Sequence, residues 1–190
     1  MSLLALLDEG PRYGLQLKQQ FEDRTGDIWP LNVGQVYTTL ARLERDGLVT
    51  SSGDDTQRVY TISDAGRARL SAWFAQPERD ATPARDELVL KLILAAARGP
   101  DHLRAVIRSE RRAAVETLQA YTRLKRDPDD AADLGWLLLL DALIFKAESR
   151  IRWLDAAGTR LAQHGTPAAG DTTAGDTTAS DPQPQRQDSR

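Results

Sequence analysis

The chain has 190 residues, a formal net charge of -3 at pH 7 and no cysteine. This length allows one domain of ordinary size or two small ones, and the absence of cysteine excludes disulfides, thiolate metal sites and cysteine nucleophiles. The negative charge argues against a general polyanion binder, because a basic domain is the usual sign of nucleic-acid binding. Residues 1–75 hold eight Lys or Arg and ten Asp or Glu, so any contact with nucleic acid must come from a few well-placed cations.

Residues 1–76 are predicted to form a first domain with the order helix, helix, helix, hairpin, helix. The leucines of "LLALLDEGP" stop at a Gly-Pro pair, which ends the first helix, and "YGLQLKQQFEDRTG" is the second. The third covers 33–46. After it, "LVTSS" and "QRVYTIS" favour two strands around "GDD" because of their β-branched content. Ser63 offers an N-cap for the fourth helix.

The third helix is predicted to have one apolar side and one polar side. At 100° per residue, the predicted core stripe consists of Val33, Val36, Leu40 and Leu43. The opposite side carries Gln35, Thr38, Arg42 and Arg45. Asn32 is expected to cap the helix in a capping box with Gln35, and Gly47 to end it.

The polar side carries the groups that read DNA bases. Gln and Asn suit adenine, Thr offers a hydroxyl and a methyl group, and Arg suits guanine or phosphate. A helix that enters the major groove by its N-terminal end needs small residues there, and Gly34 meets that need. For this helix alone, a solvated amide-rich face explains the pattern equally well. The hairpin that follows favours a winged helix, with Gln57 and Arg58 near the tip of the wing.

The segments "LLALLDEGPRYGLQLKQQFE", "WPLNVGQVYTTLARLERDGLV" and "RVYTISDAGRARLSAWF" resemble the PadR-like family of winged-helix transcriptional regulators, in its order and spacing. The resemblance implies that the third helix is the recognition helix, that Tyr37 lies on it at or beside the DNA backbone, and that Tyr60 belongs to a wing strand. From the residues alone, Tyr37 could equally pack at the edge of the core. The acids Asp54 and Asp55 depart from the basic wings common in the family. The candidate DNA-binding residues are Asn32, Gly34, Gln35, Tyr37, Thr38, Thr39, Arg42, Gln57, Arg58, Tyr60 and Lys18, the last of which could also be plain surface charge.

The rest of the chain is predicted to be helical up to residue 164. Residues 77–83 are a linker by their prolines, and 84–164 hold three helices separated by "RGPD" and "RDPDD". The fold class is therefore mainly α, a winged helix-turn-helix domain followed by an all-helical dimerisation domain. Residues 165–190 repeat "AGDTT" and have few bulky apolar side chains, so a disordered tail is expected.

The last predicted helix contains "WLLLLDALIF", which is apolar on nearly every side. Ten residues with an aspartate inside are too short to span a bilayer, which takes about 20. A unit of three helices would leave part of this surface exposed, and such a patch marks a partner; a second copy would supply the symmetry that paired half-sites require, and members of the family are homodimers. The alternative is an internal core helix. The predicted dimer contacts are Leu137, Leu140, Ile144 and Ile151.

Three aromatic residues of the same region, Trp136, Phe145 and Trp153, are candidates for an effector pocket, since such pockets are largely apolar. Some family members respond to phenolic acids or planar drugs, although a packed core explains these side chains more simply. Asp141 lies inside the apolar run and needs a partner, for which Lys146 or an Arg of a second subunit is expected.

No enzyme, metal site or cofactor is predicted. The two histidines lack a second ligand at metal spacing, and no serine stands as a nucleophile. The N-terminus has no basic signal region, so a cytoplasmic protein is expected. The predicted function is a sequence-specific, homodimeric DNA-binding repressor that a small molecule or stress signal releases from a double-stranded operator. The alternatives are a protein-interaction module without strong DNA binding and a small-molecule sensor.

Overall fold

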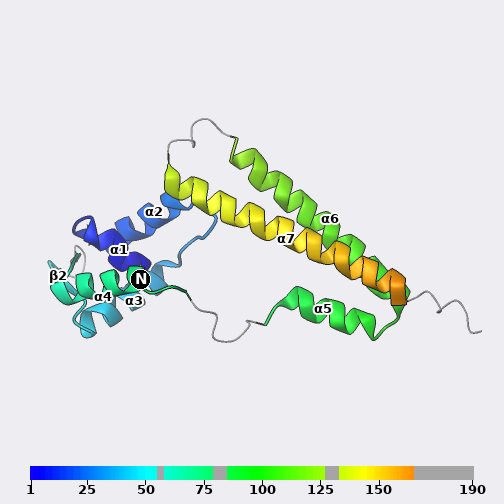
Figure 1. Ribbon diagram of the computed structural model, residues 1–190. Coiled ribbons are helices and arrows are strands. Elements are labelled where there is room, and N and C mark those ends of the chain that lie inside the picture. The colour runs from blue at the N-terminus through cyan, green and yellow to red at the C-terminus, as the bar shows by residue number, and fades with distance from the viewer. Residues whose placement is uncertain (55–57, 79–84, 127–132, 165–190) are drawn as a thin grey trace, which may run out of the picture.

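The computed structural model describes residues 1–54, 58–78, 85–126 and 133–164. Helices α1 to α4 and three short strands gather at one end of the molecule, and α5 to α7 extend away from them (Figure 1). The elements are α1 (Ser2–Asp8), β1 (Arg12–Tyr13), α2 (Gly14–Arg24), α3 (Val33–Arg45), β2 (Val49–Ser52), β3 (Val59–Ile62), α4 (Asp64–Ala75), α5 (Glu87–Ala96), α6 (Pro100–Leu124) and α7 (Leu134–His164).

The predicted winged helix is present, with one additional strand. β2 and β3 pair antiparallel, and Val49 lies opposite Ile62. Arg12 and Tyr13 form β1 on the other edge of β3, which gives the sheet order β1-β3-β2. The sequence did not predict β1 because two residues between a proline and a helix carry no alternating pattern.

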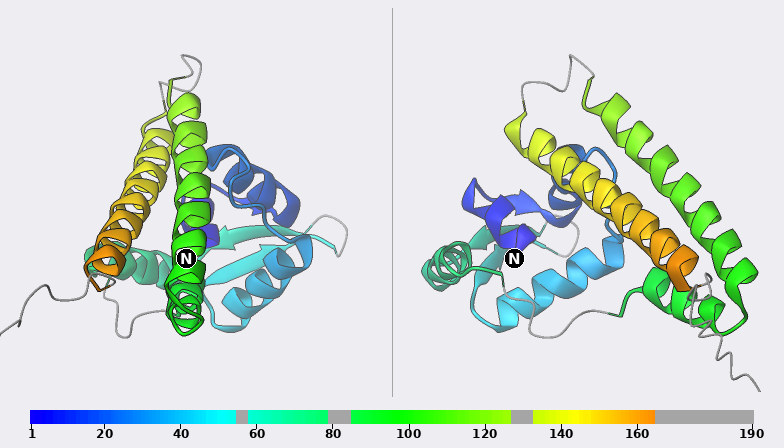
Figure 2. Two further views of the ribbon diagram at one scale, coloured as in Figure 1. Left: turned by 90° about the vertical axis from the view of Figure 1, so that its right-hand side faces the viewer. Right: turned by 45° about the vertical axis from the view of Figure 1, so that its right-hand side comes forward.

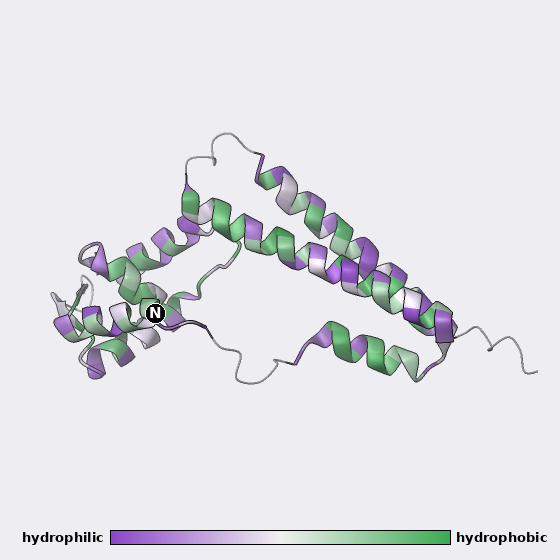
Figure 3. Cartoon of the chain, viewed as in Figure 1, coloured by the Kyte–Doolittle hydropathy of each residue, from purple (hydrophilic) through white to green (hydrophobic). Residues whose placement is uncertain are grey.

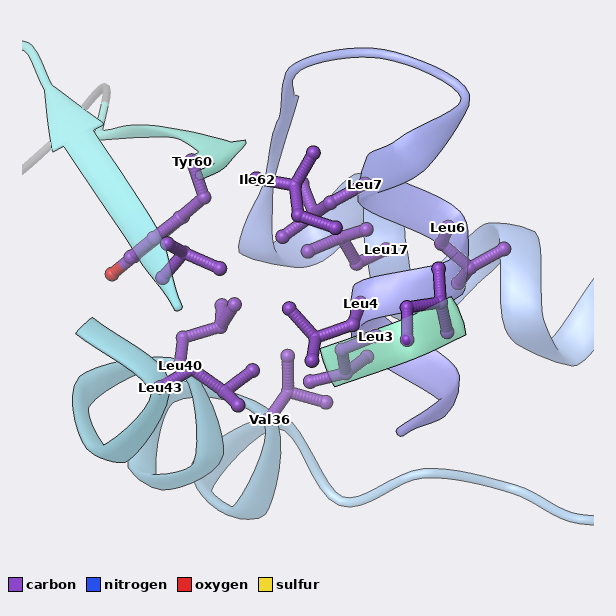
Figure 4. Packing of buried hydrophobic residues seen from close by; sticks show 12 residues of the cluster. Leu3, Leu4, Leu6, Leu7, Leu17, Val36, Leu40, Leu43, Tyr60 and Ile62 are labelled. Atoms are coloured by element: carbon purple, nitrogen blue, oxygen red, sulfur yellow. The ribbon is translucent and has the colours of Figure 1, made fainter. Parts of the chain in front are cut away.

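One hydrophobic core joins α1, α2 and α3 to the sheet and α4. Figure 4 shows side chains from these elements pointing toward one another. Its buried members are Leu3, Leu4, Leu6, Leu7, Leu17, Val36, Leu40, Leu43, Val49, Tyr60, Ile62 and Leu70. A fully buried leucine contributes about 1.5–3 kcal/mol relative to an exposed one, so the four leucines of α1 are a main support of this domain.

The helical part is built on α6 and α7, which run antiparallel side by side, while α5 packs near the end of the pair that lies away from the winged helix (Figures 1 and 2). Leu88 and Leu92 of α5 meet Ile107 of α6 and Leu154 of α7 in a second core. The Arg111 guanidinium donates to the Asp155 carboxylate at 2.6 Å and fixes α6 to α7. The predicted long last helix is the 31-residue α7.

The expected partner of Asp141 has to be corrected. Its carboxylate pairs with Lys125 at the end of α6 in the same chain, and not with Lys146, because this side of α7 faces α6. The predicted tail, 165–190, lies outside the described residues, as does most of the predicted linker. Within the described ranges, none of the helices combines the length and the apolar character that crossing a bilayer requires.

Candidate nucleic-acid interface

The candidate reading helix, α3, is fixed at both ends. The Asn32 side chain caps it by accepting a hydrogen bond from the backbone N–H of Gln35 at 3.3 Å, as expected for an Asn at this position. At the other end Gly47 has a φ of +70°, the left-handed conformation that commonly stops a helix. The bounds of this helix are therefore encoded in its flanking residues.

One side of α3 is buried and positions the other. Val36, Leu40 and Leu43 lie in the core as predicted, but Val33 is 42 % exposed. Val33 is the first residue of the helix and lies at the edge of the core, so its place in the predicted stripe has to be corrected. The three buried side chains orient α3 with its polar side outward.

That polar side is exposed and largely uncommitted. Gln35, Thr38 and Arg42 are all exposed, and no residue in the described part of the chain forms an ion pair with Arg42. The Thr38 hydroxyl donates to the Gly34 carbonyl at 2.8 Å, which leaves its methyl group and an acceptor lone pair for a base edge. Asn32 uses one lone pair of its carbonyl oxygen for the cap, which leaves its NH2 group and the second lone pair for a base.

Gly34 and Thr39 complete this face. A Cβ atom on Gly34 would lie 3.1 Å from Oδ1 of Asn32, so glycine leaves room for the cap as well as for a close approach of another molecule. Thr39 is half-buried, because it lies between the polar side and the core. Of the predicted readers on α3, Thr39 is thus the least accessible.

The Tyr37 ring packs against a glycine of the preceding helix. Its side chain is 44 % exposed, and a Cβ atom on Gly14 would lie 2.7 Å from its Cε1 atom. The ring therefore packs flush against the start of α2 while one edge remains open to solvent. The sequence did not indicate this role of Gly14, whose position in "RYG" suggests only a turn.

The wing offers fewer DNA-binding side chains than predicted. Tyr60 is on β3, but its side chain is only 4 % exposed and lies in the core (Figure 4), so its assignment as a DNA contact has to be corrected. Side chains alternate between the two faces of a strand, and Tyr60 is on the inner face. Arg58 lies 3.9 Å from Glu44 of α3, and Gln57 is outside the described residues.

Lys18, the candidate phosphate contact on α2, is half-buried and forms an ion pair with Glu22. Glu22 is itself 6 % exposed. Binding of Lys18 to a phosphate would therefore require the loss of a largely buried pair, and its structural role is the better supported one.

Two protein families match this chain. Residues 3–72 match the transcriptional regulator PadR-like family, and residues 84–162 match the virulence activator alpha C-term family. The first match takes in nearly all of the winged helix, and the second takes in α5, α6 and nearly all of α7. The winged-helix part of the chain belongs to the PadR-like family of transcriptional regulators.

Relatives of this PadR-like chain are also regulators. A probable transcriptional regulator of Mycobacterium tuberculosis is 29 % identical over 182 residues, which cover 85 % of this chain and 96 % of that protein. The negative transcriptional regulator PadR of Bacillus subtilis is 21 % identical over 168 residues, 82 % of this chain and 92 % of that protein.

Solved structures share the fold. Bacillus subtilis PadR in complex with operator DNA superposes with a TM-score of 0.64 at 20 % identity, over 84 % of this chain and 96 % of that chain. The virulence activator AphA of Vibrio cholerae gives a TM-score of 0.63 at 24 % identity, over 86 % of this chain and 97 % of that chain. The similarity thus spans both the winged helix and the helical part.

The predicted dimerisation residues of this PadR-like chain are not equally available. Leu137, Ile144 and Ile151 are half-buried, but Leu140 is fully buried within its own chain and has to be removed from the set. The apolar side chains that α7 exposes most are Leu134, Leu138 and Phe145, at 69 %, 60 % and 63 %. Periodicity did not identify these three because the helix is apolar on several sides.

The three predicted effector aromatics are far from forming one pocket. Phe145 is on the exposed side of α7, and Trp136 is buried at the start of that helix. Trp153 alone lines a groove of about 810 Å³ between α5, α6 and α7, together with Tyr121, Leu143 and the cations Lys146 and Arg150. Among the residues with a described position, no three His, Asp or Glu side chains gather as metal ligands.

Proposed function

We propose that this chain is a cytoplasmic, homodimeric repressor that recognises a double-stranded DNA operator through α3, without enzymatic activity. The observation that carries the proposal is the outward side of α3, on which Gln35, Thr38 and Arg42 are exposed while three apolar residues anchor the opposite side. These groups match adenine, thymine and guanine edges or a phosphate. The co-structure of Bacillus subtilis PadR with operator DNA supports assigning the same use to this face.

The dimer contact is proposed to involve the exposed apolar stripe of α7. Leu134, Leu138 and Phe145 are spaced by four and seven residues, so they share one side of the helix. A two-fold axis beside this stripe would relate two copies of α3, as paired half-sites in DNA require. The hydrophobic residues of α5 and of the first half of α7 are visible in Figure 3.

Release of the operator is proposed to follow the binding of an aromatic small molecule or another stress signal. The groove beside Trp153 and Tyr121 offers aromatic walls, and Lys146 and Arg150 could pair with a carboxylate. Bacillus subtilis PadR has been solved in complex with p-coumaric acid, an aromatic acid of this type. Titration of the tryptophan fluorescence with such acids would test the groove.

The central experiment is selection of bound fragments from the source genome, followed by affinity measurement on the selected operator. Arg42→Ala is expected to weaken operator binding by about 1–3 kcal/mol with an unchanged melting temperature, because Arg42 is exposed and takes part in no described ion pair. Arg160→Ala, at an exposed position near the far end of α7, is the matched control and should bind as the wild type does.

The rival function is a protein-interaction module, which the net charge of -3 favours. Salt dependence separates the two, because DNA binding through several phosphates weakens steeply as salt rises, with a slope of about -0.9 per phosphate contact. A flat salt dependence, or equal operator affinity of Arg42→Ala and the wild type, would refute the assignment of α3 as the reading helix.

A further inference from the structure

The turn between α2 and α3, residues 25–32, begins with a C-terminal capping motif that ends α2. The backbone N–H of Gly26 donates to the Asp23 carbonyl at 3.3 Å, and that of Asp27 donates to the Glu22 carbonyl at 3.0 Å. This pair of bonds defines a Schellman motif. Gly26 has a φ of +53° and Asp27 one of +56°, and the latter is uncommon for a residue with a side chain. The conformation of this turn must therefore be supported from outside.

The inner side of the turn is tied to α2. The buried Glu22 carboxylate accepts a hydrogen bond from the backbone N–H of Leu31 at 2.9 Å, one residue before the cap of α3. The Thr25 hydroxyl donates back to the Phe21 carbonyl at 2.9 Å. These bonds connect α2 to the residue before the cap of α3, so the shape of the turn sets the angle between α2 and α3.

The outer side of the turn is covered by a side chain from α7. The six-membered ring of Trp136 lies so close to Gly26 that a Cβ atom there would be 2.6 Å from Cη2 and 2.7 Å from Cζ3. Trp136 is 7 % exposed, although it is the third residue of its helix. Figure 1 shows the start of α7 beside the end of α2.

Trp136 is itself well oriented. The Asp133 carboxylate caps α7 by accepting hydrogen bonds from the backbone N–H groups of Gly135, at 2.8 Å, and Trp136, at 3.3 Å. On the other side of the contact, Arg24 at the end of α2 donates to both oxygens of Glu9, each at 2.6 Å. Trp136 belongs to the helical part and Gly26 to the winged helix, so their contact joins the helical part to the turn of the helix-turn-helix.

From this geometry we infer that Trp136 is a positioning residue for operator binding, which transmits the position of α7 to the angle of α3. The inference rests on the proposed function, because it concerns the same reading face. Movement of α7 moves the indole ring, the ring moves Gly26, and the turn that is fixed to Glu22 and Thr25 carries α3 with it. Trp136 touches no base in this arrangement and acts through α3 alone.

The indole Nε1–H of Trp136 is buried and has no hydrogen-bond partner among the described residues. Unpaired buried donors destabilise a fold, so the hydrogen-bonding capacity of the indole does not explain its presence. The ring itself fills the space over Gly26. Trp136→Phe, which keeps a flat aromatic ring and loses the N–H group, should therefore preserve positioning, whereas Trp136→Ala should not.

The test measures the affinity of the full-length protein for operator DNA and for non-operator duplex. Trp136→Ala is expected to lower operator affinity about tenfold, within the usual range of coupling between sites, while binding of non-operator duplex changes little. Gly26→Ala, which pushes the ring from the other side, should do the same, and the double variant should cost less than the two single effects together. Trp29→Ala, a tryptophan of the same turn that is 51 % exposed, is the control and should match the wild type.

A second readout excludes a purely structural role. In a protein whose Trp29, Trp73 and Trp153 are replaced by Phe, the emission of Trp136 should shift when operator is added, because coupling between two sites is reciprocal. Unchanged emission on operator binding, or additive effects of Gly26→Ala and Trp136→Ala, would overturn the inference. If the wild type itself binds no operator, the proposed function fails instead, so the two failures are distinct.

Discussion

At the scale of single residues, the reading face depends on a glycine that does not belong to it. Gly14 begins α2, and its missing side chain is what allows the Tyr37 ring to lie against that helix, since a Cβ atom would come within 2.7 Å. Tyr37 then has one fixed position next to the exposed residues of α3. A tyrosine that is positioned in advance loses less entropy on binding than a free one.

Gly14→Ala should therefore displace Tyr37. Overpacking of this kind costs about 1–3 kcal/mol, and we expect a lower melting temperature together with weaker operator binding, measured by thermal unfolding and by fluorescence anisotropy with labelled DNA. In a Tyr37→Ala background, Gly14→Ala should hardly change the melting temperature, because the ring atoms that the added Cβ would meet are absent.

Gly158→Ala is the control for this substitution. Gly158 lies inside α7, and a Cβ atom added there would meet no other atom within 4 Å, so alanine should stabilise the helix by up to about 1 kcal/mol and leave DNA binding unchanged. Equal effects of the two glycine substitutions would contradict the contact between Gly14 and Tyr37.

Residue burial was only partly predictable from the sequence. Val36, Leu40 and Leu43 followed from helical periodicity because α3 has one apolar side. Leu140 was assigned to the dimer contact because α7 is apolar on several sides, and periodicity cannot then say which side faces the chain's own helices. Tyr60 was misassigned for a related reason, since a tyrosine on a strand fits either face.

At the scale of elements, helix ends were the most predictable feature. Asn32 and Ser63 cap α3 and α4 as expected, with side chains that accept from backbone N–H groups three residues later. The Schellman motif of Gly26 was foreseen only as the end of α2. That a tryptophan more than 100 residues away covers this glycine could not be predicted, because the contact depends on how two domains pack.

The turn between α2 and α3 should make the stability of the protein sensitive to acid. The ion pair with Lys18 and the hydrogen bond from the Leu31 N–H hold the pKa of Glu22 below its ordinary value. A carboxyl group with a lowered pKa in the folded state stabilises the fold above its unfolded pKa, about 4.3, and this contribution is lost as the pH falls through the lowered value.

Glu22→Gln should therefore lower the melting temperature at neutral pH and have progressively less effect in acid, below an ordinary carboxyl pKa of about 4.3. Thermal unfolding of the wild type and the variant across this range measures the difference directly. The control is Glu116→Gln, an exposed residue of α6, which should not change the profile. A destabilisation by Glu22→Gln that is the same at all pH values would show that the charge of Glu22 is not what fixes the turn.

At the scale of the whole molecule, the proposed dimer has to account for the apolar surface that one chain leaves exposed. Leu134, Leu138 and Phe145 form one stripe on α7, and Ile93 and Leu94 of α5 are 60 % and 66 % exposed. Contiguous exposed patches of this kind mark interaction sites. The stripe on α7 begins two residues before Trp136, so a partner bound there would also restrain the contact with Gly26.

Leu138→Glu should dissociate this dimer. A charge in the centre of an apolar interface is expected to weaken association by about 2–4 kcal/mol, or ~30- to 1000-fold, and sedimentation velocity over a range of concentrations measures the shift to monomer. The monomer should retain its helical content, because Leu138 is exposed in the single chain. Operator affinity should fall as well, since two half-sites would no longer be bound together.

Two further variants test whether Leu138→Glu dissociates the dimer by disrupting the apolar stripe of α7. Leu124→Glu, at an exposed apolar position at the end of α6 outside the stripe, should remain dimeric. Leu140→Glu buries an unpaired charge inside the chain and should lose its fold, which is why this residue cannot test the interface although it lies two positions from Leu138. A Leu138→Glu protein that stays dimeric would place the two-fold axis elsewhere, with the apolar side of α5 as the next surface to test.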